Sequence, residues 1–406
     1  MEKPKIRFKG YQEDWEQRKV TELGEIYIGL VTTMTEHYTD NGHLLIRNSD
    51  IKDGYFEFGE NPIYLDEEFS EQNKSRMHQL GDVITVHTGD IGTSAVIGEN
   101  EVNSIGFATI VTRPNQEILD SNYFATYLNT DTHKQWAVSM ATGDGRSNYN
   151  LKDYTKLVVP IPEIEEQKKI AACIVNLNSL ITLHQRKCEE MKILKKYMLQ
   201  KMFPQNGQLV PQIRFSGFTE DWEQRKLPEF VTFFNGLTYT PEDVEETGTL
   251  VLRSSNVKNG EIVDADNVYV NDKVVTSENV QEGDIIVVVR NGSRALIGKH
   301  AQIKASMPNT VIGAFMSGMR SEHSSFVNAL LDTSAFENEI AKNMGATINQ
   351  ITGYMFSKME FMIPSGEEQQ KIGEYFQGLD HLITLHQQKC DELRNIKKFM
   401  LQNMFI

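Results

Sequence analysis

The sequence predicts an α/β (α+β) protein with two pseudo-two-fold-related globular domains, separated by two long antiparallel coiled-coil helices. Three observations lead to this prediction. Most of the chain is repeated after about 202–207 residues, each copy opens with short β-branched runs and helical patterns, and each copy closes with a long heptad pattern. The predicted segments are globular regions at 1–162 and 205–364, a first long helix at 163–204 and a second at 365–406.

The repeat is clearest at the ends of the two copies. The motif Glu-Asp-Trp-Glu-Gln-Arg-Lys occurs at 13–19 and again at 220–226. Segment 163–203 matches 365–405 without a gap, and 22 of 41 positions are identical. A period this long lies outside the range of solenoid repeats. It indicates a tandem duplication and a molecule with two-fold pseudosymmetry.

Each globular region mixes strand and helix signals. Short β-branched runs at Asp82–His87 and Phe107–Arg113 are punctuated by glycine and asparagine and predict strands. Helical patterns follow near Asn122–Thr130 in the first copy and near Ser325–Asp332 in the second. We therefore expect a mixed domain of strands and helices in each copy.

The boundaries of the long helices also carry signals. A proline precedes each helix, at Pro162 and Pro364. In the second copy Ser365 and Glu368 have the spacing of a capping box, with Ser365 at N-cap and Glu368 at N3. Between the copies, Pro204–Gln208 predicts a short turn-like linker.

The long helices carry a heptad, with seam residues at alternating spacings of four and three in the same register in both copies. Sustained over more than three heptads, this pattern predicts a coiled coil. Two amphipathic helices packed on separate cores remain the alternative. The predicted seam residues are Ile170, Ile174, Leu177, Ile181, His184, Cys188, Met191, Lys195, Met198 and Met202, followed in the second copy by Ile372, Phe376, Leu379, Ile383, His386, Cys390, Leu393, Lys397, Met400 and Met404.

Histidine and cysteine lie four residues apart on each seam, at His184 and Cys188 and at His386 and Cys390. Such a pair from each of two helices could bind zinc. In an antiparallel pair the two sites would face each other only if they were centred on the crossing point. We therefore expect these side chains to pack in the seam and predict no metal site.

Composition limits the class of protein. A chain of 406 residues with 39% hydrophobic and 24% charged residues predicts a soluble protein of two or three domains. It contains no stretch of 18 apolar residues, no N-terminal signal peptide and only three cysteines. We expect a cytoplasmic protein without disulfides and without membrane contact.

Sequence motifs of catalysis are incomplete or missing. Asn61–Tyr64 resembles an adenine methyltransferase motif but lacks its second proline, and no glycine loop for S-adenosylmethionine is present. Gly292–His300 resembles a P-loop, but its glycines are one residue too far apart and His300 replaces the Ser or Thr that would hold Mg²⁺. The chain is therefore expected to be a binding protein and not an enzyme.

Candidate binding residues lie in three polar loops of each globular region, where the copies align but differ in chemistry. Arginine reads guanine bidentately and asparagine or glutamine reads adenine bidentately, so these loops suit DNA recognition. The candidates are Arg47, Asn48, Ser49, Lys52, His87, Thr88, Arg146 and Asn148 in the first copy, and Arg253, Ser254, Ser255, Asn256, Lys258, Arg290, Asn291, Ser293, Arg294, Thr347, Asn349 and Gln350 in the second.

The net charge of −15 at first opposes nucleic-acid binding. Residues 1–162 hold 15 Lys and Arg against 25 Asp and Glu, and residues 205–364 hold 13 against 20, whereas segment 163–204 holds 8 against 5. A DNA contact would therefore need locally clustered basic residues or the help of a partner.

Together these features resemble the specificity subunit of type I restriction–modification systems. The resemblance is carried by the two divergent domains, the two similar helices, the opening motif Ile-Arg-Phe at 6–8 and 213–215, and the exit Ile-Pro-x-x-x-Glu-Gln at 161–167 and 363–369. It covers the whole chain. It implies that each globular region is a target recognition domain that reads one half of an asymmetric bipartite double-stranded DNA site.

The resemblance also implies partners. In this family the coiled coil separates the recognition domains and docks two methyltransferase subunits, which bind S-adenosylmethionine and methylate adenine N6. Up to two restriction or motor subunits use ATP and Mg²⁺. No cofactor is then expected on this chain itself. A self-contained enzyme with degenerate motifs, and a scaffold that binds protein or glycan, remain the rival interpretations.

Overall fold

The computed structural model describes residues 3–141, 148–205, 207–344 and 349–405, and these fold into two compact units. Unit 1 comprises residues 1–185 and 388–406, and unit 2 comprises residues 186–387. Each unit therefore contains one globular domain, the first half of the long helix that follows this domain, and the second half of the other long helix. Over the described ranges, no helix is long and apolar enough to cross a membrane.

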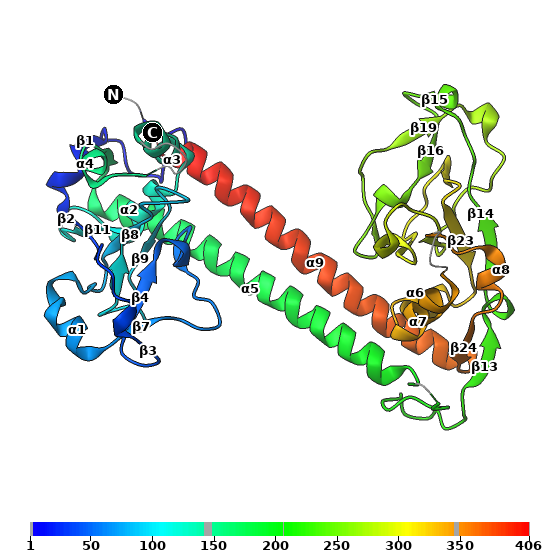
Figure 1. Ribbon diagram of the computed structural model, residues 1–406. Coiled ribbons are helices and arrows are strands. Elements are labelled where there is room, and N and C mark those ends of the chain that lie inside the picture. Colours follow the sequence, from blue (N-terminus) through cyan, green and yellow to red (C-terminus); the bar gives the residue numbers. More distant parts are fainter. Residues whose placement is uncertain (1–2, 142–147, 206, 345–348, 406) are drawn as a thin grey trace. The chain divides into compact units, whose positions relative to one another are not determined.

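The globular domain of unit 1 contains two four-stranded sheets (Figure 1). One is antiparallel in the order β2-β11-β8-β9, and the other is mixed in the order β10-β4-β7-β3, with β10 parallel to β4. The pair β1-β12 and the hairpin β5-β6 complete the strands. Their bounds are β1 Glu16–Lys19, β2 Gly24–Ile28, β3 Tyr38–Thr39, β4 His43–Arg47, β5 Ile51–Lys52, β6 Tyr55–Phe56, β7 Tyr64–Leu65, β8 Val83–Thr85, β9 Ser94–Val96, β10 Ile105–Phe107, β11 Ile110–Pro114 and β12 Val158–Ile161.

The globular domain of unit 2 repeats this topology strand for strand. Its sheets run β14-β23-β20-β21 and β15-β19-β16-β22, with β22 parallel to β16, beside the pairs β13-β24 and β17-β18. The bounds are β13 Glu223–Lys226, β14 Thr232–Asn235, β15 Val244–Glu245, β16 Thr249–Leu252, β17 Val257–Lys258, β18 Glu261–Ile262, β19 Val268–Val270, β20 Ile285–Val288, β21 His300–Gln302, β22 Thr310–Ile312, β23 Met316–Arg320 and β24 Glu360–Ile363. The duplication predicted from the sequence is confirmed at the level of the fold.

Short helices cover the antiparallel sheets where the sequence predicted them. The predicted helices near 122–130 and 325–332 are confirmed, and each begins one residue earlier than expected. Unit 1 contains α1 Glu67–Gln72, α2 Ser121–Leu128, α3 Asp131–Met140 and α4 Leu151–Tyr154, and unit 2 contains α6 Ser324–Leu331, α7 Ser334–Asn343 and α8 Gly353–Phe356.

One predicted strand was wrong in its extent. The run Phe107–Arg113 is divided between β10 and β11 by a turn at Ala108, which has a φ of 50°. A β-branched run alone does not reveal a residue in the left-handed region, so this turn could not be predicted from the run.

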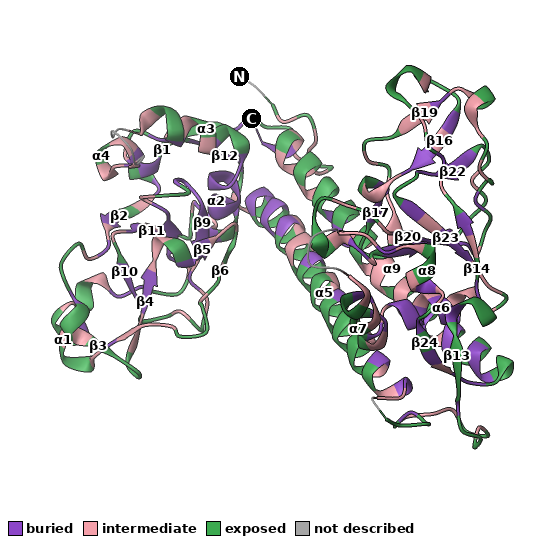
Figure 2. Cartoon of the chain, turned by 45° about the vertical axis from the view of Figure 1, so that its right-hand side comes forward, coloured by how far each residue is buried: buried purple, intermediate pink, exposed green. Residues whose placement is uncertain are grey.

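The long helices are α5 Ile164–Met202 and α9 Gly366–Met404. Within each unit their halves run antiparallel. In unit 1 the Cys390 thiol donates to the carbonyl oxygen of Ile181 at 3.6 Å, and in unit 2 the Cys188 thiol donates to that of Ile383 at 3.8 Å. Every predicted seam residue is buried or half-buried, so the heptad is confirmed in each unit (Figure 2). The cysteines pack in the seam, and no group of three potential metal ligands occurs among the described residues.

The capping prediction for α9 is only partly confirmed. Ser365 Oγ accepts the backbone N–H of Glu368 at 3.4 Å, as an N-cap residue does. The Glu368 carboxylate does not return to the cap. It binds the Arg214 guanidinium through two bonds of 2.7 and 2.8 Å.

That ion pair explains why the opening and exit motifs recur together. Arg7 binds the fully buried Glu166 in unit 1 through bonds of 2.7 and 2.8 Å, as Arg214 binds Glu368 in unit 2. Bidentate guanidinium–carboxylate bonds combine charge with a fixed geometry. The opening segment of each domain is thereby tied to the first turn of the long helix that leaves it.

The last residues of each long helix complete the core of a globular domain. In unit 1 the Phe405 ring lies 6.3 Å from Trp15 and 5.5 Å from Tyr123, measured between ring centroids. In unit 2 the Phe203 ring lies 5.9 Å from Trp222. The tryptophans belong to the repeated Glu-Asp-Trp-Glu-Gln-Arg-Lys motif, so this motif is conserved between the copies because it forms the pocket for the helix end.

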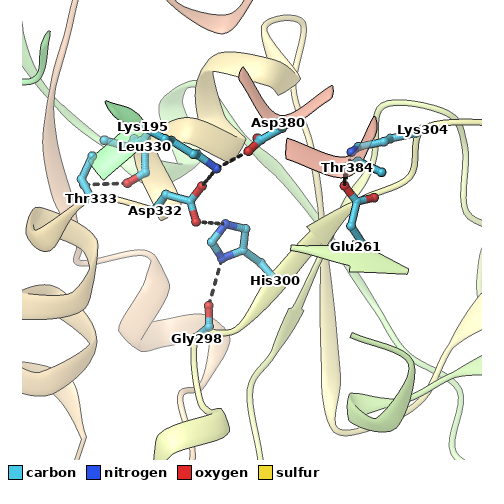
Figure 3. Close-up of polar contacts among 10 residues, drawn as sticks. All are labelled: Lys195, Glu261, Gly298, His300, Lys304, Leu330, Asp332, Thr333, Asp380 and Thr384. Carbon is cyan, nitrogen blue, oxygen red and sulfur yellow. Dashed lines mark hydrogen bonds and ion pairs between the residues drawn. The ribbon is translucent and has the colours of Figure 1, made fainter. Parts of the chain in front are cut away.

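A half-buried charged joint holds the domain of unit 2 on its helices (Figure 3). Lys195 of α5 binds Asp332, at the end of α6, at 2.7 Å and Asp380 of α9 at 2.6 Å, and His300 approaches Asp332 at 3.4 Å. Burial opposes the ionisation of Asp332, but His300 and Lys195 lower its pKa to about 2. Burial outweighs the attraction of Lys195 at Asp380 and raises the pKa of that carboxyl.

Unit 1 has an equivalent joint between its domain and its helices, with fewer charged side chains. Lys397 occupies the position of Lys195 and binds Asp53 at 3.0 Å, and 44% of the Asp53 side chain remains exposed. Asn178 stands where unit 2 has Asp380, and it lines a small cavity together with Lys397 and Asn129. The lysine is therefore common to both joints, whereas each unit supplies its own acceptors.

We expect Lys195→Met to destabilise unit 2 by about 1.5–3 kcal/mol, because the half-buried Asp332 and Asp380 lose the cation that they share. The matched change Lys397→Met should destabilise unit 1 by only about 1 kcal/mol or less, since Asp53 keeps solvent contact. Urea denaturation with hydrogen exchange assigned to each unit measures both losses. Equal losses in the two units would contradict this account of the joint.

We also expect fragment 1–204 to form a homodimer with an isologous interface. A second copy of α5 can replace the missing half of α9, because Lys195, Met198, Met202 and Phe203 repeat the residues at Lys397, Met400, Met404 and Phe405. In the homodimer, Met191 of the second copy takes the place of the buried Leu393. This exchange of one hydrophobic side chain for another should cost less than ~1.5 kcal/mol of stability.

Light scattering at micromolar concentration tests the fragment. The control variant Phe203→Asp, which places a charge in the pocket of Trp15, should be monomeric. A monomeric parent fragment would refute the equivalence of the two helix ends.

Candidate nucleic-acid interface

The polar loops singled out in unit 2 converge on one surface. Asn291 Nδ2 donates to Ser254 Oγ at 3.0 Å, which joins the second loop to the first. A β-bridge between Arg290 and Gln350, together with a 3.0 Å bond from Asn349 Nδ2 to the Gly292 carbonyl oxygen, joins the second loop to the third. Residues up to 97 positions apart in the sequence thus form one cluster.

Unit 1 assembles its loops in the same way. Asn48 Oδ1 accepts the backbone N–H of His87 at 2.7 Å, and Thr88 Oγ1 donates to Asn148 Oδ1 at 2.8 Å. Burial lowers the pKa of His87, so its imidazole is neutral near pH 7. A neutral imidazole and a hydroxyl can read base edges by hydrogen bonding, whereas they add no charge for phosphate binding.

The predicted cations differ in how far they are already neutralised. Arg47 binds Asp50 through bonds of 3.0 and 2.9 Å, and Arg253 binds Asp266 at 2.6 Å. Arg290 and Arg294 are exposed, and neither has an ion pair among the residues that the structure describes. Among the predicted cations of unit 2, Arg290, Arg294 and the exposed Lys258, which also has no ion pair among the described residues, are therefore available to a phosphate or a base.

The remaining first-loop candidates are mostly accessible. Ser49 and Ser255 are exposed, Ser254 and Lys52 are half-buried, and the Lys52 ammonium donates to the Ser49 carbonyl oxygen at 2.9 Å. Lys258 and Ser293 are exposed, and the Ser293 backbone N–H donates to Asn291 Oδ1 at 2.9 Å. The candidates Arg146 and Thr347 lie outside the described residues.

Asn256 does not fit the role predicted for it. Its side chain is fully buried, accepts the Arg253 backbone N–H at 2.9 Å and donates to the Ala265 carbonyl oxygen at 2.8 Å. Asp50 caps the equivalent turn in unit 1 through the Arg47 backbone N–H at 2.8 Å. Asn256 therefore shapes the first loop from inside and cannot reach DNA. The signal was available, because an acceptor three residues after the turn begins is typical of a capping residue.

Sequence reasoning missed the apolar residues of this surface. In unit 2 a cavity of ≈ 700 Å³ is lined by Arg253, Ser254 and Ser255 and also by Val244 and Phe315. Phe315 is 55% exposed, and the Arg290 guanidinium lies over its ring, 5.0 Å from the centroid. An isolated aromatic residue in a loop gives no periodic signal, so no sequence pattern pointed to it.

A second surface lies on the long helices, away from the seam. Leu180, Leu183, Leu194 and Tyr197 of α5 are each more than a third exposed. Their spacing of 3, 11 and 3 residues places them on one side of the helix. The equivalent positions of α9 are also apolar and exposed, at Leu382, Leu385, Ile396 and Phe399. Unit 1 contains the Leu180–Leu183 pair of α5 and the Ile396–Phe399 pair of α9, and unit 2 contains the other two pairs. Both units therefore expose apolar side chains at equivalent positions.

Comparison with known proteins agrees with this geometry. The sequence model of the family described as type I restriction modification DNA specificity domain matches residues 12–192 and 219–395. Two relatives from Methanocaldococcus jannaschii are the type I restriction enzyme MjaVIII specificity subunit, 21% identical over 80% of this chain and 78% of its own length, and the putative type I restriction enzyme MjaX specificity subunit, 23% identical over 95% and 91%.

The fold is also found in a solved structure. The crystal structure of a type I restriction–modification S subunit from M. genitalium aligns with a TM-score of 0.70 at 15% identity, over 100% of this chain and 99% of that one. Both halves of the chain, each with its own loop cluster and long helix, match the family model. The chain therefore belongs to the family of type I restriction–modification DNA specificity subunits.

Proposed function

We propose that this chain is the non-catalytic DNA-specificity subunit of a cytoplasmic type I restriction–modification complex, and that each globular domain reads one half of an asymmetric bipartite site. The observation that carries the proposal is the duplicated loop cluster. The two clusters share one backbone framework but present different side chains, namely His87, Thr88 and Asn148 in one and Arg290, Asn291 and Gln350 in the other. Because the two loop clusters share a backbone framework but carry different side chains, they suit a DNA site whose two halves differ in sequence.

We propose that α5 and α9 set the spacing of the half-sites. Each helix contains 39 residues and is about 58 Å long at ~1.5 Å per residue. Half-sites read from one face of the duplex lie about 34–36 Å apart, one helical turn, which domains on helices of this length can span. A seam continuous along both helices would supply the rigidity that a fixed spacing requires.

The exposed apolar positions of the helices support the docking of two methyltransferase subunits. A soluble protein gains nothing from eight exposed Leu, Ile, Phe and Tyr side chains at equivalent positions of two helices unless a partner covers them. Because the same set occurs in each unit, two copies of one partner fit better than two different partners.

The chemistry would reside on the partners. The methyltransferase subunits would bind S-adenosylmethionine and flip the target adenine, and up to two motor subunits would use ATP and Mg²⁺. The acidity of the globular regions fits this division, because partners that contact the backbone would supply the phosphate neutralisation that the chain lacks.

Co-expression with a type I methyltransferase subunit from the source genome tests the proposal. Single-molecule methylome sequencing should show N6-methyladenine at one asymmetric bipartite site. Failure to co-purify with a methyltransferase would favour a scaffold that binds protein or glycan. Methylation by the chain alone would favour a self-contained enzyme.

We expect the triple change Arg290→Ala, Asn291→Ala and Arg294→Ala to alter only the half-site that residues 205–364 read. Each lost bidentate contact should reduce discrimination by about 1–3 kcal/mol. The reciprocal control, His87→Ala with Thr88→Ala, should alter only the other half-site. Methylomes of the two variants measure both effects, and a change in both half-sites from either variant would contradict separate reading.

We expect Leu382→Asp with Leu385→Asp to remove one methyltransferase from the complex and leave the other bound, because a carboxylate cannot be buried in an apolar contact without a large cost. Adding Leu180→Asp and Leu183→Asp should remove both. Native mass spectrometry counts the subunits, with Gln377→Asp on an exposed polar position of α9 as the control. Two bound partners in the first variant would disprove this docking surface.

A further inference from the structure

Each recognition domain exposes a phenylalanine near the parallel strand pair of its mixed sheet. Phe107 is 40% exposed and lies where β10 runs into β11, and Phe315 lies between the equivalent strands β22 and β23. Phe107 is the last residue of β10, whereas Phe315 follows β22 by three residues, and the bridges of Phe107 to Leu30 and of Gly313 to Leu237 make Gly313 the equivalent of Phe107. Each phenylalanine nevertheless lies beside the first polar loop of its own domain, which distinguishes it from scattered surface apolar residues.

The backbone at each phenylalanine is held by the predicted DNA-reading loops. In unit 2 the Phe315 carbonyl oxygen accepts the N–H groups of Val289 and Arg290 at 3.0 and 3.2 Å. In unit 1 Asn48 Nδ2 donates to the carbonyl oxygens of Phe107 and Ala108 at 3.4 and 3.1 Å. An exposed aromatic side chain on a fixed backbone is positioned before it meets a ligand.

The neighbours of Phe315 show what kind of ligand it faces. The Arg290 guanidinium, which has no acidic partner among the described residues, lies over the Phe315 ring. The cavity that Phe315 lines is also lined by Ser254 and Ser255. A cation beside hydroxyl groups suits a polar, anionic ligand with hydrogen-bonding edges. The phenylalanine adds an apolar contact, and the apolar group that DNA presents beside its polar base edges is the 5-methyl group of thymine.

We propose that Phe315 reads a thymine methyl group in the half-site of residues 205–364, and that Phe107 does so in the half-site of residues 1–162. The proposal rests on the proposed function and deepens it, because it adds an apolar determinant to the polar reading of each half-site. The Arg290 guanidinium stacked on the ring limits the positions that the ring can take.

Deoxyuridine substitution tests the proposal. The complex of this chain with its methyltransferase partner is bound to duplexes in which each thymidine of the site is replaced in turn by deoxyuridine, which lacks the methyl group. At one position of the second half-site, we expect the parent complex to bind about fourfold more weakly after the replacement, the loss of one buried methyl contact. Phe315→Ala should bind the two duplexes equally.

Two further variants complete the test. Phe107→Ala should keep the thymine preference of the second half-site and lose that of the first, and Phe315→Leu, which keeps an apolar side chain, should retain part of the preference. A thymine preference unchanged by Phe315→Ala at every position, or a half-site without thymine on either strand, would overturn the proposal. A parent complex without any sequence preference would instead refute the proposed function.

Discussion

Each unit depends on a core that its own repeat cannot complete. Phe405 fills the aromatic cluster of Trp15 and Tyr123, and Phe203 fills that of Trp222, although each phenylalanine comes from the far end of the helix that belongs to the other repeat. Because the helix end must arrive at this cluster, the number of residues in α5 and α9 is fixed at 39 in both copies. An insertion of one residue would rotate every later seam position by about 100°. The ungapped match of the helices is a consequence of this requirement.

The two copies combine an invariant frame with local freedom. The Arg7–Glu166 and Arg214–Glu368 pairs, the tryptophans and the seam are alike in both units, and they hold the domain on its helices. The joints at Lys195 and Lys397 use one lysine with different acceptors, two half-buried carboxylates in unit 2 and one more exposed carboxylate in unit 1. The polar loops differ most between the two copies, because a substitution there changes the contact with a ligand and not the core.

Periodic and repeated features were predictable from the sequence. The duplication and the heptad follow from spacing and from alignment of the copies, whereas the convergence of the three polar loops of each domain became visible only in the structure. The partners of Lys195 were not predictable, because Asp332 lies 137 residues away and meets it only through the fold. Asn256 was misjudged because its spacing as a turn-capping acceptor was not weighed against a role in binding. Phe315 was missed because an exposed aromatic residue matches no pattern.

The backbone of the chain has the connectivity of a ring. In unit 1 the Ile6 backbone N–H donates to the Asn403 carbonyl oxygen at 2.9 Å, and in unit 2 the Ile213 N–H donates to the Lys201 carbonyl oxygen at the same distance. The first junction joins the two ends of the chain without a covalent bond, and the second is continuous through the linker at 204–208. The order of the two repeats along the gene is therefore arbitrary for the fold, and a circularly permuted chain opened at this linker would keep the ion pairs, the aromatic clusters and the seam of both units.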